Sequence, residues 1–391
     1  MNNLISVFNK KIKIITPNDD YHYFFAYYDM RATGENGINK KHLCHRVKFM
    51  DRLPTPTDVC ELGYLDDNEF YKIGETTAWN FQQGAMLQYH PFKEDTVFYN
   101  VEIDGKFKTV THNFKTGEKS YTDMATACVS PDGRYGLSIN FGRIFAFRPG
   151  YGYANFIDKN ANVNAPSDDG VFLTDMATCK SRLLVSYKDM AKKVGFNDNE
   201  KILINHITFN TTSNKYVMLV RNFPQDGKMW GTSMVVGDLN GNIKTILEKT
   251  YVSHYKWITA NKILVHCNVK KGEEYRNLYM INVDDCSFVE YDSYYFHREH
   301  NPDIHCSLTP DGKYIIGDGY PIGDYRSILA INLKTMQSKE ILKVKTNNPI
   351  CTDIRCDLHA RYVYDGTHVS FDTLHNGKRQ IAVFPISEIN F

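Results

Sequence analysis

Short apolar runs alternate with turn-forming residues along nearly the whole chain, and helical periodicity is almost absent. For example, Thr309-Pro310-Asp311-Gly312 is a tight-turn signal, and the run from Lys313 to Gly317 that follows it is typical of a buried strand. The combination recurs roughly every 40 to 55 residues, a repeat length typical of β-propellers. The pattern therefore predicts an all-β chain made of repeated four-stranded units.

Seven such repeats, of roughly four strands each, predict a single seven-bladed β-propeller domain over residues 1–391. The strand-like run 11–15 is a candidate additional strand for the last repeat, where it would close the ring. A long insertion at 140–169 interrupts the third repeat, and residues 188–202 are predicted to include a short surface helix. The predicted repeats are 22–73, 79–122, 125–187, 204–248, 252–292, 303–343 and 357–387.

A histidine recurs at one register of four consecutive repeats. Each lies three residues before an apolar residue and ahead of a turn and a strand, and the steps between them are 48, 51 and 54 residues. Equivalent positions of a closed repeat face one point, so the four imidazoles are expected at one mouth of the channel, where the inner strands begin. These histidines are His206, His254, His305 and His359.

Three of these histidines, with two carboxylates, are candidate metal ligands. Asp303 and Asp357 each stand two residues before a histidine, and positions i and i+2 of a strand point the same way. Mixed His and Asp ligation suits Zn²⁺ or Mn²⁺. Each Asp-x-His could instead be a hydrogen-bonded pair that links two blades, and both interpretations stay open. The candidate ligands of a divalent metal are His254, His305, His359, Asp303 and Asp357.

Arginine, tyrosine and histidine gather in the insertion and in the fourth repeat. An arginine can bind a carboxylate bidentately, which acidifies the proton on the adjacent carbon. A histidine or tyrosine can then take that proton while a tyrosine protonates the leaving oxygen, which is a β-elimination. Packing is the alternative role for each tyrosine. The candidate catalytic residues are His206, Tyr151, Tyr153 and Arg221, and the candidate substrate-binding residues are Arg143, Arg148, Asn80, Gln83, Tyr28 and Asn205.

Charge and hydropathy exclude some classes of partner and location. The net charge is +1 and the charges are interspersed, so no basic stripe indicates a nucleic-acid partner. The sequence has no stretch of about 18 apolar residues, so no transmembrane segment is expected. The first residues lack a charged region followed by an apolar one, so no signal peptide is visible and a cytoplasmic location is expected. Nine cysteines without tight pairing are predicted to be reduced core thiols.

Seven motifs, spread over nearly the whole chain, resemble those of the seven-bladed propeller polysaccharide lyases. The resemblance is nearest to ulvan lyases and more distant to oligogalacturonate lyase. It implies a propeller, an acidic, uronate-containing saccharide as partner, and a metal near His254, His305 and His359. The motifs are His22 to Asp29, Trp79 to Gly84, Arg148 to Tyr153, Asn205 to Ile207, Ser253 to Trp257, Arg355 to His359 and Gly377 to Gln380.

Three functions fit these patterns. The first is lyase-type cleavage of an acidic saccharide. The second is a cytoplasmic enzyme of surface-polysaccharide biosynthesis, such as a transferase that acts on a nucleotide- or lipid-linked sugar. The third is a non-catalytic propeller that binds a glycan or a protein.

Overall fold

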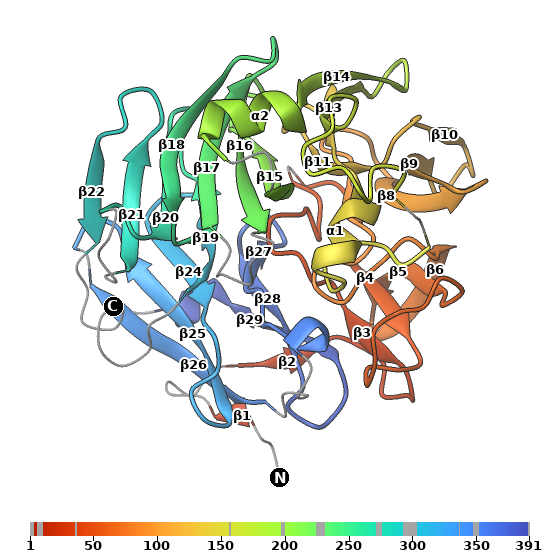
Figure 1. Ribbon diagram of the computed structural model, residues 1–391. Coiled ribbons are helices and arrows are strands. Elements are labelled where there is room, and N and C mark those ends of the chain that lie inside the picture. The colour runs from red at the N-terminus through yellow and green to blue at the C-terminus, as the bar shows by residue number, and fades with distance from the viewer. Residues whose placement is uncertain are drawn as a thin grey trace. The chain divides into compact units, whose positions relative to one another are not determined.

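The computed structural model describes residues 4–5, 11–35, 37–155, 158–196, 200–223, 231–270, 276–291, 303–335, 337–346 and 352–389. It is nearly all β, and its strands form seven sheets arranged as a β-propeller, which confirms the predicted fold class (Figure 1). No helix in these ranges is long and apolar enough to cross a membrane. The contacts group the chain into two compact units, which are described in turn.

The first compact unit comprises Met1–Tyr99, His112–Glu118 and Tyr291–Phe391. Blade one is β3 (His22–Phe24), β4 (His42–Val47), β5 (Cys60–Asp66) and β6 (Glu69–Thr76). Blade six is β23 (His305–Leu308), β24 (Tyr314–Asp318), β25 (Tyr325–Asn332) and β26 (Ser338–Lys345). Blade seven is β27 (Arg361–Val363), β28 (His368–Thr373) and β29 (Gln380–Pro385), between the 3₁₀ turns Thr352–Ile354 and Ile386–Glu388.

Two N-terminal strands complete the last two blades. The strand β2 (Lys13–Ile14) pairs antiparallel with β29, so the predicted closing strand is confirmed. The strand β1 (Leu4–Ile5) pairs with β26 and makes blade six five-stranded, which the sequence pattern did not predict. Between these two blades, a buried cluster that includes Ile316, Val344 and Phe371 forms the core.

The second compact unit comprises Asn100–Thr111 and Lys119–Glu290. Blade three is β11 (Thr126–Val129), β12 (Tyr135–Ser138), β13 (Gly170–Asp175) and β14 (Lys180–Ser186). Blade four is β15 (Lys201–Phe209), β16 (Lys215–Phe223), β17 (Gly231–Asp238) and β18 (Ile243–Thr250). Blade five is β19 (Val252–Trp257), β20 (Lys262–Cys267), β21 (Asn277–Asn282) and β22 (Phe288–Tyr291). The sheet of blade two, divided between the units, is β7 (Gln88–Tyr89), β8 (Thr96–Ile103), β9 (Lys106–Asn113) and β10 (Lys119–Tyr121).

Two short helices interrupt the strands of the second unit. The helix α1 (Phe141–Phe147) opens the predicted insertion, and the Asn140 side chain caps it by accepting from the amide of Arg143. The helix α2 (Tyr187–Val194) begins at the cap residue Ser186 and ends at Gly195, whose φ of +71° suits a glycine. The short helix expected within 188–202 is therefore confirmed, although it begins one residue earlier and the end of that range belongs to β15.

Turn chemistry sets the register of the strands that carry the site. The Thr309 hydroxyl accepts from the amides of Lys313 and Tyr314, and Gly312 takes a φ of +69°. This tight turn joins β23 to β24 in a register that places His305 opposite Asp318.

Candidate functional site

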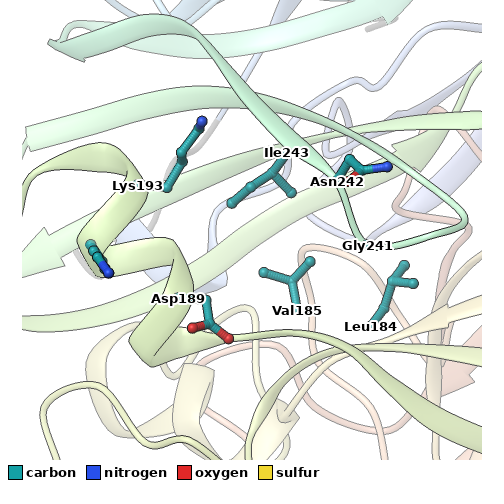
Figure 2. Close-up of a pocket in the computed structure, with 8 residues that line it drawn as sticks. Leu184, Val185, Asp189, Lys193, Gly241, Asn242 and Ile243 are labelled. Atoms are coloured by element: carbon teal, nitrogen blue, oxygen red, sulfur yellow. The ribbon is translucent and has the colours of Figure 1, made fainter.

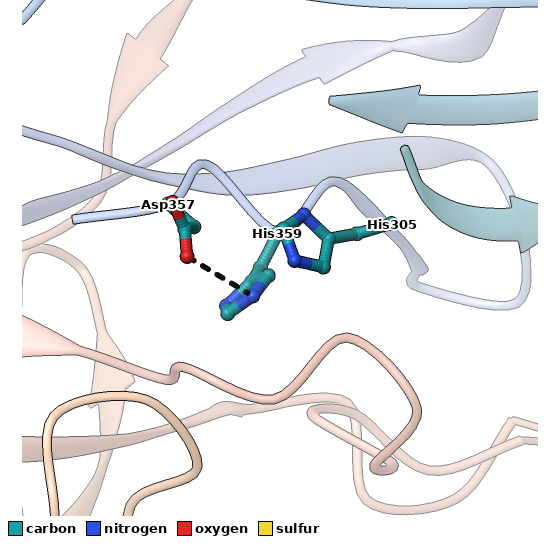
Figure 3. Close-up of side chains that lie close together, drawn as sticks. All are labelled: His305, Asp357 and His359. Atoms are coloured by element: carbon teal, nitrogen blue, oxygen red, sulfur yellow. Dashed lines mark ion pairs between the residues drawn. The ribbon is translucent and has the colours of Figure 1, made fainter. Parts of the chain in front are cut away.

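Two histidines and one aspartate meet in the first compact unit. His305, Asp357 and His359 are buried, and each offers one ligand atom, all within 4.8 Å of one another (Figure 3). His305 is the first residue of β23, whereas the other two lie on the segment before β27. The rings of His305 and His359 are nearly perpendicular, with centroids 4.3 Å apart.

The backbone at His359 differs from the extended strand that the sequence suggested. Residues 355–360 form no strand, and His359 has a φ of +45°, which residues other than glycine rarely adopt. Asp357 and His359 nevertheless lie close, with 4.0 Å between Oδ2 and Nε2. Strained backbone of this kind is common at functional sites.

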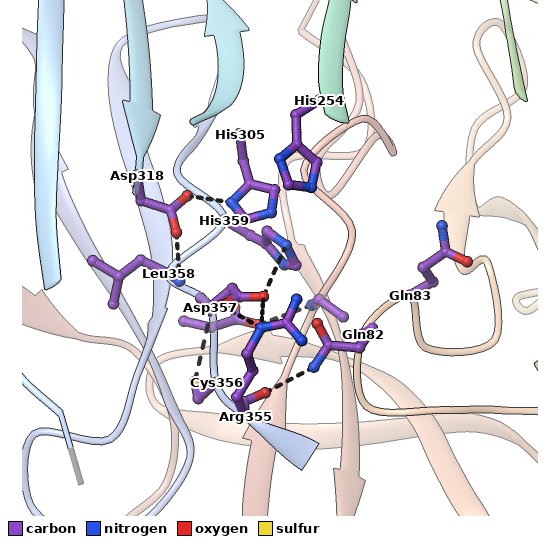
Figure 4. A network of polar contacts seen from close by, with 12 residues as sticks. Gln82, Gln83, His254, His305, Asp318, Arg355, Cys356, Asp357, Leu358 and His359 are labelled. Atoms are coloured by element: carbon purple, nitrogen blue, oxygen red, sulfur yellow. Dashed lines mark hydrogen bonds and ion pairs between the residues drawn. The ribbon is translucent and has the colours of Figure 1, made fainter. Parts of the chain in front are cut away.

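Asp318, which the sequence reasoning missed, also belongs to this group. Its Oδ1 lies 3.4 Å from Nδ1 of His305, and the same carboxylate accepts from the amides of Leu358 and Ala360 (Figure 4). Asp318 therefore holds both His305 and the segment that carries His359. The predicted ligand Asp303 is buried, and its charge is one of those that raise the pKa of His305.

Two guanidinium groups hold Asp357. The Nε of Arg355 lies 2.8 Å from Oδ2, and Nη2 of Arg326 lies 2.7 Å from Oδ1. Burial alone would raise the pKa of Asp357, but these two cations outweigh it and keep that pKa well below its ordinary value. Asp357 is therefore a permanent carboxylate that accepts from Arg355, whereas its 4.0 Å separation from His359 is too long for the hydrogen-bonded Asp-x-His pair considered from the sequence.

The surroundings shift the pKa values of the two histidines in opposite directions. Burial, reinforced by the charge of His305, holds the pKa of His359 well below its ordinary value, which favours the neutral imidazole. Burial also acts to lower the pKa of His305, but Asp318, Asp357 and Asp303 outweigh it and raise that pKa. Because a metal binds the neutral imidazole, protons compete with a metal more strongly at His305, whose pKa is raised, than at His359.

These residues fit a divalent cation. Ligand atoms about 2.1 Å from one tetrahedral ion are roughly 3.4 Å apart, so small rotations of the three side chains would bring them into one coordination shell. Two imidazole nitrogens and one carboxylate oxygen form a donor set that suits manganese or zinc. His254, the third predicted histidine ligand, belongs to the second compact unit, and its participation stays a prediction.

Of the residues predicted to bind substrate, Tyr28 lies beside this group. The Tyr28 ring lies 5.3 Å from the His305 ring and 5.7 Å from the His359 ring. Asn80 is fully buried, and its side chain accepts from the amides of Gln82 and Gln83, so it shapes its own loop. Gln83 is 6% exposed. Tyr28 therefore lies beside the histidines, whereas the Asn80 side-chain oxygen accepts within its own loop.

Gln82 and Arg379 fix the segment that presents Arg355 and Asp357. Both donate to the carbonyl of Arg355, at 3.0 Å each (Figure 4). Gln82 also donates to the carbonyl of Asp353, and Arg379 to that of Ile354. Although no regular strand is present there, this irregular backbone is held by side-chain hydrogen bonds.

The second compact unit gathers another set of predicted residues. The guanidinium carbon of Arg148 lies 4.0 Å from the centroid of the Tyr151 ring, and its Nη1 donates to Oδ1 of Asn205 at 3.3 Å. The Tyr151 ring meets the His206 ring edge-on at 5.8 Å, and the His206 ring lies 5.8 Å from that of His254. The insertion, blade four and blade five thus contribute to one group, here called the Arg148 group.

A β-bulge aims His206 within β15. The pairing of β15 with β16 shifts between Asn205 and Ile207, and His206 takes a φ of +54°. Bulges often redirect a side chain beside an active site. Arg221 lies on the paired strand opposite Leu203 and is 6% exposed.

Arg143 is engaged by the protein itself, contrary to the expectation that it binds substrate. Its Nε donates to the carbonyl of Ile202, Nη1 to Asp158 and to the carbonyl of Asn160, and Nη2 to two further carbonyls of the insertion. These acceptors use all five N–H groups of a guanidinium. Arg143 is fully buried and therefore organises the insertion.

Tyr153 is likewise a core residue in its observed contacts, not a proton-transfer group. It is fully buried, its ring stacks on Phe141 at 4.3 Å, and its hydroxyl accepts from Nδ2 of Asn100. Burial also raises the pKa of the Tyr153 hydroxyl above its ordinary value. The alternative of packing, considered for each tyrosine, describes Tyr153, whereas Tyr151 contacts Arg148 and His206.

A surface hollow of about 560 Å³ lies where α2 faces the turn before β18 (Figure 2). Asp189, Lys192 and Lys193 of α2 line it, together with Leu184, Val185 and residues 241–243. None of the predicted site residues contributes to this lining. The two groups of site residues described above therefore do not line this hollow.

No protein-family model matches the chain, and no curated protein matches it in sequence. Solved structures with the same fold include oligogalacturonate lyase in complex with manganese, with a TM-score of 0.68, 12% identity, and coverage of 99% of this chain and 97% of that one. Oligogalacturonate lyase from Vibrio parahaemolyticus gives a TM-score of 0.64 and 13% identity over 98% of both chains. The tricorn protease gives 0.51 and 11% identity over 95% of this chain and 34% of that one. At these identities the similarity establishes the propeller fold.

Proposed function

We propose that this protein acts on an acidic, uronate-containing saccharide by β-elimination and holds a divalent metal at His305, Asp357 and His359. The observation that carries the proposal is the Arg148 group. It combines a cation for a carboxylate with an imidazole and a phenol for proton transfer. The similarity in fold to oligogalacturonate lyases, one of them bound to manganese, supports the same class of substrate. The sequence motifs add a resemblance to ulvan lyases.

In this proposal each member of the Arg148 group has one role. Arg148 binds the uronate carboxylate, which stabilises negative charge as it develops on that group. His206 takes the proton from the carbon next to the carboxylate, and Tyr151 gives its proton to the glycosidic oxygen that leaves. The electron pair of the broken C–H bond forms the new double bond. Asn205 orients Arg148 through their hydrogen bond.

The cluster of His305, Asp357 and His359, here called the metal group, has a separate role. A divalent ion bound there supplies a fixed positive charge for acidic groups of the saccharide. Asp357 contributes a permanent carboxylate to that ion because two arginines keep its pKa low. Asp318 keeps His305 and the His359 segment in place for the ion.

The test is a scan of uronate-containing polymers, polygalacturonate and ulvan among them. Elimination produces an unsaturated uronate that absorbs in the ultraviolet, so absorbance should rise with time for the correct polymer. His206→Ala should abolish this rise and leave saccharide binding intact. Binding without any unsaturated product would refute the lyase activity and favour a binding propeller or a transferase.

A further inference from the structure

Tyr320 lies in the loop that joins β24 to β25, immediately after Asp318 and Gly319. It is 39% exposed, although the arginines and the aspartate of the metal group behind it are buried. A single exposed aromatic residue is unremarkable by itself. The Tyr320 ring is distinguished by its two neighbouring arginines, Arg355 and Arg326.

Two guanidinium groups lie against the Tyr320 ring. The guanidinium carbon of Arg355 is 5.4 Å from the ring centroid, and that of Arg326 is 5.9 Å from it. Both arginines also bind Asp357, and Arg326 donates to the carbonyl of Gly319 in the same loop. The ring and the two cations are therefore held together by fixed contacts.

This combination fits one uronate unit. A pyranose ring presents an apolar face of C–H groups, for which an exposed aromatic ring is a suitable surface. The carboxylate at the edge of a uronate is the group that an arginine fork binds best. A neutral sugar would use only the ring of Tyr320, and a small anion would use only the arginine.

The position of the loop within its blade gives independent support. The loop connects the second and third strands of blade six, and the insertion that carries Arg148 and Tyr151 makes the same connection in blade three. Both connections therefore present a tyrosine whose ring lies against an arginine, at 4.0 Å in one case and 5.4 Å in the other.

We propose that Tyr320 and Arg355 form a subsite that binds one uronate unit of the saccharide, with the sugar ring on Tyr320 and the carboxylate at Arg355. The proposal rests on the proposed function and adds to it a determinant of binding outside the Arg148 group. The subsite contributes to affinity and not to proton transfer.

Isothermal titration of the full chain with trigalacturonate, and with maltotriose as a neutral match, tests the subsite. Tyr320→Ala should weaken binding of trigalacturonate about tenfold, as expected when an aromatic anchor is lost. Tyr320→Trp should retain binding, and its indole fluorescence should change as saccharide is added. Tyr71→Ala, which removes a tyrosine that is 47% exposed on β6, is the matched control and should bind as the wild type does.

The outcomes separate the subsite from the proposed function. If Arg148→Ala weakens binding and Tyr320→Ala does not, the subsite is refuted and the proposed function stands. Equal binding of maltotriose and trigalacturonate by the wild type would refute the carboxylate-binding roles of Arg355 and Arg148 alike. If the wild type binds neither trigalacturonate nor ulvan oligosaccharides, the proposed function itself fails, and the subsite fails with it.

Discussion

Replacing Arg143 by alanine distinguishes two roles for this residue. From the sequence, Arg143 is a substrate ligand, so its loss should weaken saccharide binding and leave the fold intact. In the structure its guanidinium is fully buried and donates to four carbonyl groups and to Asp158. Its loss would remove one hydrogen-bond donor from each of these acceptors and leave the buried Asp158 carboxylate without its cation, although Asn140 and the amide of Asn160 still donate to that carboxylate.

The expected cost is large. Removing one partner of a buried, hydrogen-bonded ion pair costs about 3–5 kcal/mol. An unfolding entropy of about 2.1 cal/mol/K per residue gives about 1.2 °C per kcal/mol for a chain of 391 residues, so Arg143→Ala should lower the melting temperature by roughly 4–6 °C. Arg143→Lys keeps the charge but loses the planar fork, so we expect it to fall between the alanine variant and the wild type.

Thermal unfolding followed by circular dichroism is the assay, with Arg134→Ala as the matched control because Arg134 is an exposed arginine of blade three. The control should melt within about 1 °C of the wild type, as surface substitutions usually do. An Arg143→Ala protein that melts like the wild type but no longer binds saccharide would refute the structural role. It would restore the prediction made from the sequence.

Three further predictions concern the metal group and the Arg148 group. His305→Ala should remove about one equivalent of bound divalent metal and lower the melting temperature, as metal analysis of protein purified without a His tag would show; equal melting of variant and metal-free wild type would contradict this. Burial acts against the raised pKa of His305 but Asp318 outweighs it, so the ion pair stabilises the metal-free protein below the ordinary value of 6.5 and is lost as the pH rises through the raised pKa. Asp318→Asn should flatten this pH dependence in urea titrations, and an unchanged profile would refute the pairing. Arg148→Ala should weaken binding of an acidic saccharide by about 30-fold or more with the fold intact, because a desolvated arginine–carboxylate contact is worth roughly 2–4 kcal/mol; wild-type affinity would place the site elsewhere.

The repeat pattern predicted the fold because turns and apolar runs determine strand pairing locally. The same pattern also determines that Asp318 pairs with His305. With Thr309-Pro310-Asp311-Gly312 as the turn, an antiparallel register pairs Leu308 with Ile315 and therefore His305 with Asp318. The sequence pattern indicated Asp303 instead, because Asp303 is close to His305 along the chain whereas Asp318 is its neighbour only in the sheet.

The roles of Arg143 and Tyr153 could not be predicted from their sequence neighbourhood. Arginine and tyrosine in a glycine-rich insertion look alike whether they face a ligand or the protein interior. The outcome depends on a helix of seven residues that turns Arg143 toward the loop 158–164 and stacks Phe141 on Tyr153. Positive φ at His206 and His359 is similarly a product of the surrounding strands.

The loop around Arg143 surrounds its cation with oxygens, as a calcium-binding loop surrounds its ion. The cation here is covalently part of the chain, so neither dilution nor a chelator can remove it. The ordering of the insertion that carries Arg148 and Tyr151 is consequently independent of metal supply. A chelator should therefore act on the histidine–aspartate group alone, and this makes metal depletion a selective means of measuring what that group contributes.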